Sequence, residues 1–331
     1  MEKLLISNSP HIRSNSTTKR IMIDVCIALL PAFLMGIVYF GPMCILIVGL
    51  AVLSAVLAEF CYKLIMKKPM RVILKEFDYT SVVTGLLLGL NLHSTVAWYL
   101  PILGSAFAII VVKMIFGGTG KNFVNPALAG RIFLFISFSA IMANGWAATS
   151  IRNIGGVSLT TGATALGSVL KGNFDKIPSN LDLFLGTGIA GCIGETCKAA
   201  LLLGGIYLLV RRVIDWKPVI YILVTGLWTV VIKGFDFNYF LPSILSGGLF
   251  LGAIFMATDY VTCPNTKIGT YIYYVLLGVI TAWLRVRTGG EVVSFVIFVM
   301  NLCVPLIDRF VVPKPFGYQK PEKKKSEKGG N

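Results

Sequence analysis

Charge is scarce in this chain, and negative charge is the scarcer sign. Only 14% of its 331 residues are charged, and 15 acidic residues stand against 30 basic ones. Soluble globular domains carry about 25% charged residues, so the composition excludes an ordinary soluble enzyme. With 56% hydrophobic residues and a mean hydropathy of +0.79, the chain is predicted to be an integral membrane protein.

Side chains that bind metals are also few. His11 and His93 are the two histidines and lie far apart, which argues against a histidine metal site. The seven cysteines contain no C-x-x-C pair, and Cys192 and Cys197 lack the further ligands that an iron–sulfur centre needs. We therefore predict no metal and interpret the cysteines as packing residues.

A glycine-rich stretch, FGGTGKNFVNPALAGR, resembles a nucleotide-binding loop only superficially. A Walker loop needs glycine where Ile115 stands and Ser or Thr where Asn122 stands. Asn125 followed by Pro126 is instead typical of a helix N-cap and its first helical residue. We expect this loop to begin a span and to contact a head group or a partner.

Long apolar runs are what the sequence has in abundance. A helix needs about 20 apolar residues to cross a hydrocarbon core of about 30 Å. Ten windows are predicted to span the membrane: 21–40, 43–65, 79–92, 98–116, 126–143, 183–210, 219–232, 239–257, 270–284 and 292–312. The expected fold is an all-α integral membrane protein with about ten transmembrane helices.

Two halves of five spans would begin on opposite sides of the membrane, as in an inverted repeat with broken helices. The window 79–92 is short for a span, and 183–210 is too long unless it is tilted or broken. The expected organisation is an amino-terminal segment 1–20, a first membrane half 21–143, an extracytoplasmic loop 144–182, a second membrane half 183–312 and a basic tail 313–331.

Positive charge predicts the orientation of the chain. If the amino terminus is cytoplasmic, most of the 30 Lys and Arg residues lie at or near the cytoplasmic face, and Lys198 lies inside a span. The external side then receives Arg152, Lys171, Lys176, Lys233, Arg285 and Arg287. We therefore expect a bacterial inner-membrane protein with both termini cytoplasmic, and lipid rather than nucleic acid accounts for the basic excess.

Three acidic residues fall within or near apolar windows: Asp24, Glu59 and Glu195. Ionisable groups are costly in a membrane, so each is a candidate for an ion site. Glu195 and Lys198 are three positions apart, and mutual neutralisation on one helix face is the plainer explanation for that pair.

The extracytoplasmic loop contains the uncharged stretch GGVSLTTGATALGSVL. Within it Thr164 follows Gly162 and Ala163, whose small size leaves space for a bulky group to approach a hydroxyl. Thr160 and Thr161 offer further hydroxyls.

TTGAT resembles the sequence to which a flavin transferase attaches FMN through its phosphate, as an ester of the last threonine. One departure is Ser158, at a position where such motifs often carry an acidic residue. The stretches SPHIRS, DYTSVVTGLLLGLNL, GGTGKNFVNPALAGR, GCIGET and TDYVTCPNT extend the likeness over nearly the full chain. The whole resembles the D subunit of the Rnf complex (RnfD) and, more distantly, the B subunit of the sodium-pumping NADH:quinone reductase (NqrB).

This resemblance implies a membrane subunit of an ion-translocating ferredoxin:NAD oxidoreductase, which couples electron transfer to Na⁺ or H⁺ movement. It implies covalent FMN on Thr164, and it leaves room for a second, non-covalent flavin. The implied partners are Rnf subunits A, B, C, E and G and a flavin transferase. Ferredoxin and NAD sites belong to other subunits in that family, which fits a chain without a dinucleotide fingerprint.

Two other functions stay open from the residues alone. Ten spans with broken helices also describe a channel or secondary transporter for a small solute, with no redox role. A passive scaffold whose loop never carries flavin is the third interpretation. Covalently bound flavin distinguishes the first function from the other two.

Overall fold

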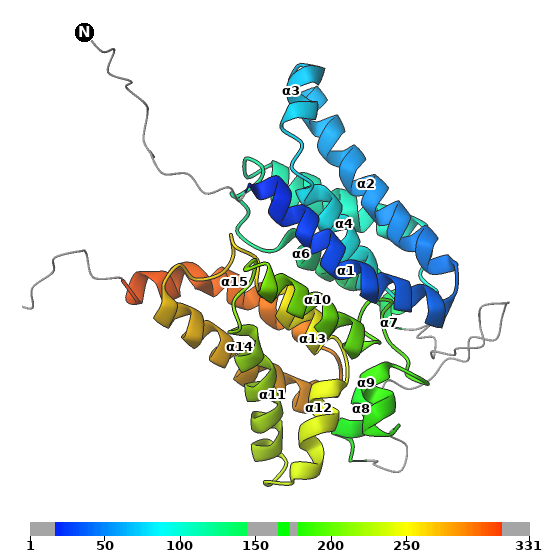
Figure 1. Ribbon diagram of the computed structural model, residues 1–331, viewed down its shortest axis with the longest axis vertical. Coiled ribbons are helices and arrows are strands. Elements are labelled where there is room, and N and C mark those ends of the chain that lie inside the picture. Colours follow the sequence, from blue (N-terminus) through cyan, green and yellow to red (C-terminus); the bar gives the residue numbers. More distant parts are fainter. Residues whose placement is uncertain (1–16, 144–164, 173–177, 313–331) are drawn as a thin grey trace, which may run out of the picture.

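The computed structural model describes residues 17–143, 165–172 and 178–312 (Figure 1). Every regular element in these ranges is a helix, so the expected all-α fold is confirmed. In chain order the helices are α1 (Thr18–Phe40), α2 (Met43–Ile65), α3 (Met70–Lys75), α4 (Thr80–Leu90), α5 (Tyr99–Phe107), η1 (Ala108–Met114), α6 (Pro126–Ser137), α7 (Ser139–Ala143), α8 (Ala165–Leu170), α9 (Asn180–Leu185), α10 (Lys198–Val210), α11 (Pro218–Ile232), η4 (Phe237–Tyr239), α12 (Phe240–Leu245), α13 (Leu249–Leu251), η5 (Gly252–Met256), α14 (Lys267–Thr288) and α15 (Val293–Phe310).

Four of these helices, α1, α2, α14 and α15, are long and apolar enough to cross a membrane as single rods. A fifth candidate span is a bent pair, Phe237–Leu245 with Leu249–Met256, whose two parts meet at 67°. Five shorter apolar helices cover the other windows: Thr80–Leu90, Tyr99–Met114, Pro126–Ser137, Lys198–Val210 and Pro218–Ile232. Each predicted window thus contains at least one helix. Window 219–232 is helical throughout and is short in itself, whereas in window 183–210 part of the chain is not helical.

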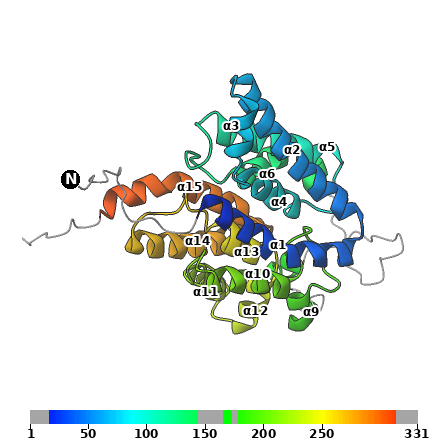
Figure 2. The ribbon, with the colours of Figure 1, turned by 45° about the horizontal axis from the view of Figure 1, so that its top comes forward.

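Helices α2 to α6 lie together on one side of the molecule and α11, α12 and α14 on the other, with α1 and α10 between them (Figures 1 and 2). In the first half α2 packs on α4 and α5, and α5 packs on α6. In the second half α11 packs on α14, and α14 packs on α15. Across the boundary α1 lies along α10 and α6 contacts α15.

Small residues allow helices to approach closely inside the first half. A Cβ atom on Gly85 of α4 would lie 2.7 Å from the carbonyl oxygen of Ala51 in α2. One turn later, a Cβ on Gly89 would lie 2.9 Å from the Cα of Val48. Membrane helices use such small residues because backbone contact replaces the hydrophobic driving force that lipid removes.

The window 183–210 is broken. α9 ends at Gly186, whose φ of 91° is left-handed, and helix resumes only at Lys198. The chain between these helices meets the non-helical chain after α4, where the Ile193 N–H donates to the Leu92 carbonyl at 3.0 Å. Irregular backbone at membrane depth needs such partners. Glu195 lies in this break and is buried in the protein core, with 5% of the residue exposed.

Candidate functional site

Two cavities lie toward opposite ends of α6. Cavity A, of about 430 Å³, is lined by Asn125 and Pro126, where the helix begins. Cavity B, of about 520 Å³, is lined by Arg131, Ile132 and Phe135, further along the same helix. Both volumes fall in the range of about 300–1,000 Å³ that is usual for small-molecule sites. Within the described ranges, no group of three His, Cys, Asp or Glu side chains is placed to hold a metal ion.

Cavity B lies one residue from the predicted flavin attachment site. Ala165 and Leu166, the first residues of α8, are buried and line it. Consecutive Cα atoms are about 3.8 Å apart, so a group attached to Thr164 starts within one residue of the cavity wall. The predicted motif itself lies outside the described residues: Thr160, Thr161, Gly162, Ala163 and Thr164.

Lys233 fixes α8 to the second half of the protein. Its ammonium donates to the carbonyl oxygen of Leu170, the last residue of α8, at 2.7 Å. The same ammonium lies 5.5 Å from the ring centroid of Tyr239. A cation at a helix C-terminus satisfies a carbonyl that has no partner within the helix. Leu166 and Val169 bury the apolar face of α8, so the helix is held from two sides.

We expect Lys233→Met to lower the free energy of unfolding by about 1–2 kcal/mol, because it removes a hydrogen bond from a charged donor. Thermal unfolding of the purified protein in detergent measures the change. Lys171→Met is the matched control, since Lys171 is exposed and directly follows α8; its effect should stay within about 0.5 kcal/mol. Equal losses in both variants would contradict the anchoring role.

Arg131 is half-buried, and its hydrogen-bond partners at cavity B are neutral. One guanidinium nitrogen, Nη1, donates to Asn91 Oδ1 at 2.5 Å and to Ser294 Oγ at 2.9 Å. The other, Nη2, donates to Cys192 Sγ at 3.7 Å. A single side chain of α6 thereby contacts the end of α4, the start of α15 and the break before α10.

Glu195 does not pair with Lys198. Its Oε1 accepts a hydrogen bond from the Cys192 N–H at 3.0 Å, and its Oε2 has no partner among the described residues. Lys198 Nζ donates instead to the carbonyl of Thr196 at 3.2 Å. The expected neutralisation is wrong because α10 begins at Lys198, so Glu195 lies in irregular chain and the two residues do not share a helix face.

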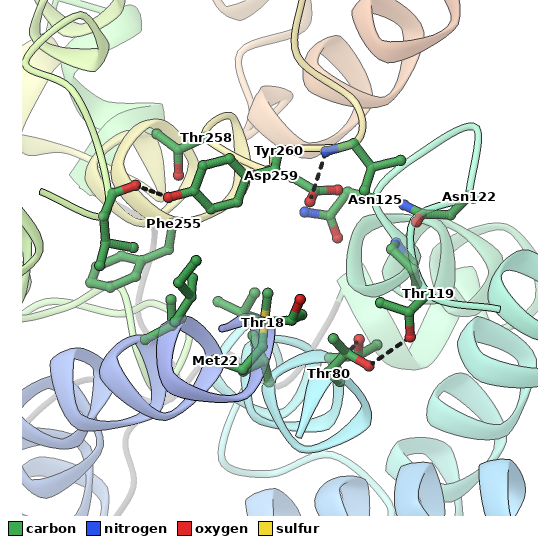
Figure 3. A pocket seen from close by; sticks show the side chains of 18 of the residues that line it. Thr18, Met22, Thr80, Thr119, Asn122, Asn125, Phe255, Thr258, Asp259 and Tyr260 are labelled. Atoms are coloured by element: carbon green, nitrogen blue, oxygen red, sulfur yellow. Dashed lines mark hydrogen bonds between the residues drawn. The ribbon is translucent and has the colours of Figure 1, made fainter. Parts of the chain in front are cut away.

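Cavity A combines an apolar wall with a polar rim (Figure 3). The hydroxyls of Thr80 and Thr119 point toward one another on one side of the cavity. Asp259 and Tyr260 lie across from them, with Phe255 on the apolar wall. The rim therefore offers hydroxyl, carboxylate and phenol groups to an occupant.

Asp78 holds this rim together from outside the helices. Thr119 Oγ1 donates to Asp78 Oδ2, and Thr80 Oγ1 donates to Asp78 Oδ1, both at 2.6 Å. Burial raises the pKa of Asp78, but these hydrogen bonds and the charge of Lys113 outweigh it, so its pKa lies below the ordinary value. The ionised carboxylate ties the glycine-rich loop to the start of α4, and this agrees with a structural loop.

The other two candidate acids form ion pairs and line neither cavity. Glu59 of α2 lies 2.7 Å from Lys113 and 2.6 Å from Lys63. Asp24 of α1 lies 3.2 Å from Arg211, the residue that directly follows α10. Among the acids predicted as ion sites, Glu195 alone reaches a cavity, so the three do not form one site.

Sequence reasoning missed Arg131 and Lys113, which it counted as charges at the ends of spans. In the structure Lys113 is 3% exposed and lines cavity A, and Arg131 lines cavity B. The available signal was their position inside the apolar windows 98–116 and 126–143, where an ionisable residue indicates a site.

Comparison with known proteins covers nearly the whole chain. The model of the NQR2, RnfD, RnfE family matches residues 5–317. The chain is 41% identical to the D subunit of the Na⁺-translocating ferredoxin:NAD⁺ oxidoreductase complex of Acetobacterium woodii, over 97% of each chain. It is 35% identical to the D subunit of the proton-translocating ferredoxin:NAD⁺ oxidoreductase complex of Clostridium ljungdahlii, over 94% of this chain and 96% of that protein. It is 34% identical to the D subunit of the ion-translocating oxidoreductase complex of Stutzerimonas stutzeri, over 91% and 93%. On these matches, the chain belongs to the NQR2, RnfD, RnfE family.

Proposed function

We propose that this chain is the D subunit of an Rnf-type ferredoxin:NAD oxidoreductase complex and carries FMN as an ester of Thr164. The observation that carries the proposal is cavity B, which is lined by Ala165, by Arg131 and by Glu195, whose buried Oε2 has no partner among the described residues. A polar ring system attached to Thr164, the residue before Ala165, fits such a cavity. Bound FMN would supply an electron carrier that accepts and releases electrons singly or in pairs.

The residues of this chain would attach, orient and shield that group. Thr164 provides the hydroxyl for the ester, and α8, anchored by Lys233, fixes the direction in which it enters cavity B. Phe135 and Phe295 lie edge to face with centroids 5.6 Å apart and form an apolar wall that excludes water.

The names of the relatives, each a D subunit of a complex, support partner subunits in the membrane. We propose Rnf subunits A, B, C, E and G as partners in the membrane, and a flavin transferase during maturation. The ferredoxin and NAD sites lie on other subunits. The name of the Acetobacterium woodii relative specifies Na⁺ and that of the Clostridium ljungdahlii relative specifies protons, and both stand as coupling ions for this chain.

We propose a second, non-covalent flavin in cavity A. Its volume of about 430 Å³, the apolar wall at Met22 and Phe255, and the polar groups of Asn125 and Asp259 all suit a planar ring with carbonyl and N–H groups on one edge. Two flavin sites toward opposite ends of α6 would let electrons pass along the first half of the protein.

In-gel fluorescence tests the covalent flavin directly. The full chain, expressed with a flavin transferase, should give a fluorescent band after denaturation, because an ester bond survives the loss of the fold. Absence of the band despite an active transferase would contradict the electron-carrier function and favour a channel, a transporter or a scaffold.

We also propose that the chain lies in the bacterial inner membrane with both termini cytoplasmic and Thr164 external. In a background without native cysteines, Ser168→Cys in α8 should react with a membrane-impermeant thiol reagent on intact cells. Lys121→Cys, in the glycine-rich loop, should react only after lysis and serves as the control. The reverse pattern of labelling would invert the topology.

A further inference from the structure

Arg131 and Glu195 carry opposite charges and line the same cavity, yet they do not pair. Neither takes part in an ion pair within 4.0 Å in the described part of the chain. The guanidinium of Arg131 contacts an amide, a hydroxyl and a thiol, all neutral. One carboxylate oxygen of Glu195 is held by a backbone N–H, and the other is buried without a partner.

The neighbouring charged groups are already engaged. Glu291, which also lines cavity B, lies 2.9 Å from Arg285 and accepts the Gly248 N–H at 3.1 Å. Lys198 donates to a backbone carbonyl and lies outside ion-pair distance of Glu195. The protein groups described around the cavity therefore leave both Arg131 and Glu195 without a counter-charge in contact.

A buried charge without a partner is costly, and Glu195 is buried while Arg131 is half-buried, so this arrangement suits a cavity whose occupant bridges the two groups. The occupant must offer an acceptor to Arg131 and an N–H donor to Glu195 Oε2. The pyrimidine edge of a flavin ring offers both, because its N3–H lies between the C2 and C4 carbonyls.

We propose, on the basis of the FMN proposed for Thr164, that Arg131 and Glu195 bind this pyrimidine edge and set the reduction potential of the ring in opposite directions. The positive charge of Arg131 stabilises an electron added to the ring, and the negative charge of Glu195 opposes it. The effect of Glu195 is strengthened because this side chain is buried, where the effective dielectric is low.

An equilibrium redox titration of the intact complex, with FMN attached, tests the pair. At a fixed potential Arg131→Gln should lower the ratio of reduced to oxidised flavin at least tenfold, and Glu195→Gln should raise it at least tenfold. A tenfold change corresponds to a shift of 59 mV for a one-electron step. Glu76→Gln is the control and should leave the ratio unchanged, since Glu76 is exposed and lies next to α3.

Opposite shifts, with equal in-gel flavin fluorescence in all variants, support the assignment. Shifts of the same sign would indicate loosened packing and overturn it, and unchanged potentials would overturn it as well. Should Arg131→Gln fail to assemble, the sign of the Glu195→Gln shift decides. A lack of flavin in the unmodified complex would overturn the proposed function itself, whereas unshifted potentials overturn this inference alone.

Discussion

Thr164→Ala is expected to abolish covalent FMN on the chain while leaving the protein inserted and folded. The ester needs a hydroxyl, and alanine has none. The loop stretch around Thr164 has little apolar bulk, and a loop change of Thr to Ala typically costs within about 0.5 kcal/mol of unfolding free energy. In-gel fluorescence and mass spectrometry of the full chain, expressed with a flavin transferase, measure the loss.

The neighbouring threonines provide matched controls. Thr160→Ala and Thr161→Ala should keep the fluorescent band, because only Thr164 is preceded by Gly-Ala and stands in the register of the attachment motif. Thr164→Ser retains a hydroxyl and should keep part of the label. FMN mapped to Thr160 or Thr161 in the Thr164→Ala variant would make the assignment wrong.

The length of the apolar runs predicted the helices of this fold well, because a helix that crosses a membrane must be a long apolar segment and is therefore visible in the sequence. α1 and α2 begin and end within three residues of their windows. Asn125 caps α6 as expected, its side chain accepting from the Ala127 N–H at 3.0 Å. Window 183–210 was predicted from its length to be tilted or broken, and the break is confirmed. Mean hydropathy does not show where it falls, because the non-helical backbone is paired with the chain after α4.

The site was only half predictable. The motif around Thr164 and the acid at Glu195 could both be identified locally, by residue type and by position in an apolar run. The place of Glu195 in the same cavity as Arg131 could not be predicted, since the contact between α6, α15 and the break joins residues far apart in the chain. The three-residue spacing also wrongly predicted that Glu195 pairs with Lys198, because the i, i+3 rule assumes a continuous helix.

The buried ion pairs at Glu59 should have the largest effect on stability. Lys113 and Lys63 both contact Glu59, and the side chains of Glu59 and Lys113 are each 3% exposed. Glu59→Gln removes the single carboxylate that both ammonium groups share. We expect a loss of about 3–5 kcal/mol, the usual cost of leaving a buried charge without its partner. Titration of the purified protein with a denaturing detergent measures it.

The reciprocal change should cost less, and this asymmetry distinguishes charge from packing. Lys113→Met leaves Glu59 with Lys63 as its counter-charge, so no uncompensated carboxylate remains. The double variant Glu59→Gln/Lys113→Met should therefore be more stable than Glu59→Gln alone, because the deepest ammonium is gone. Glu76→Gln removes the exposed pair with Lys68 and should cost less than about 1 kcal/mol. If Lys113→Met were as damaging as Glu59→Gln, and the double variant worse than either, the cost would come from lost volume rather than from an orphaned charge.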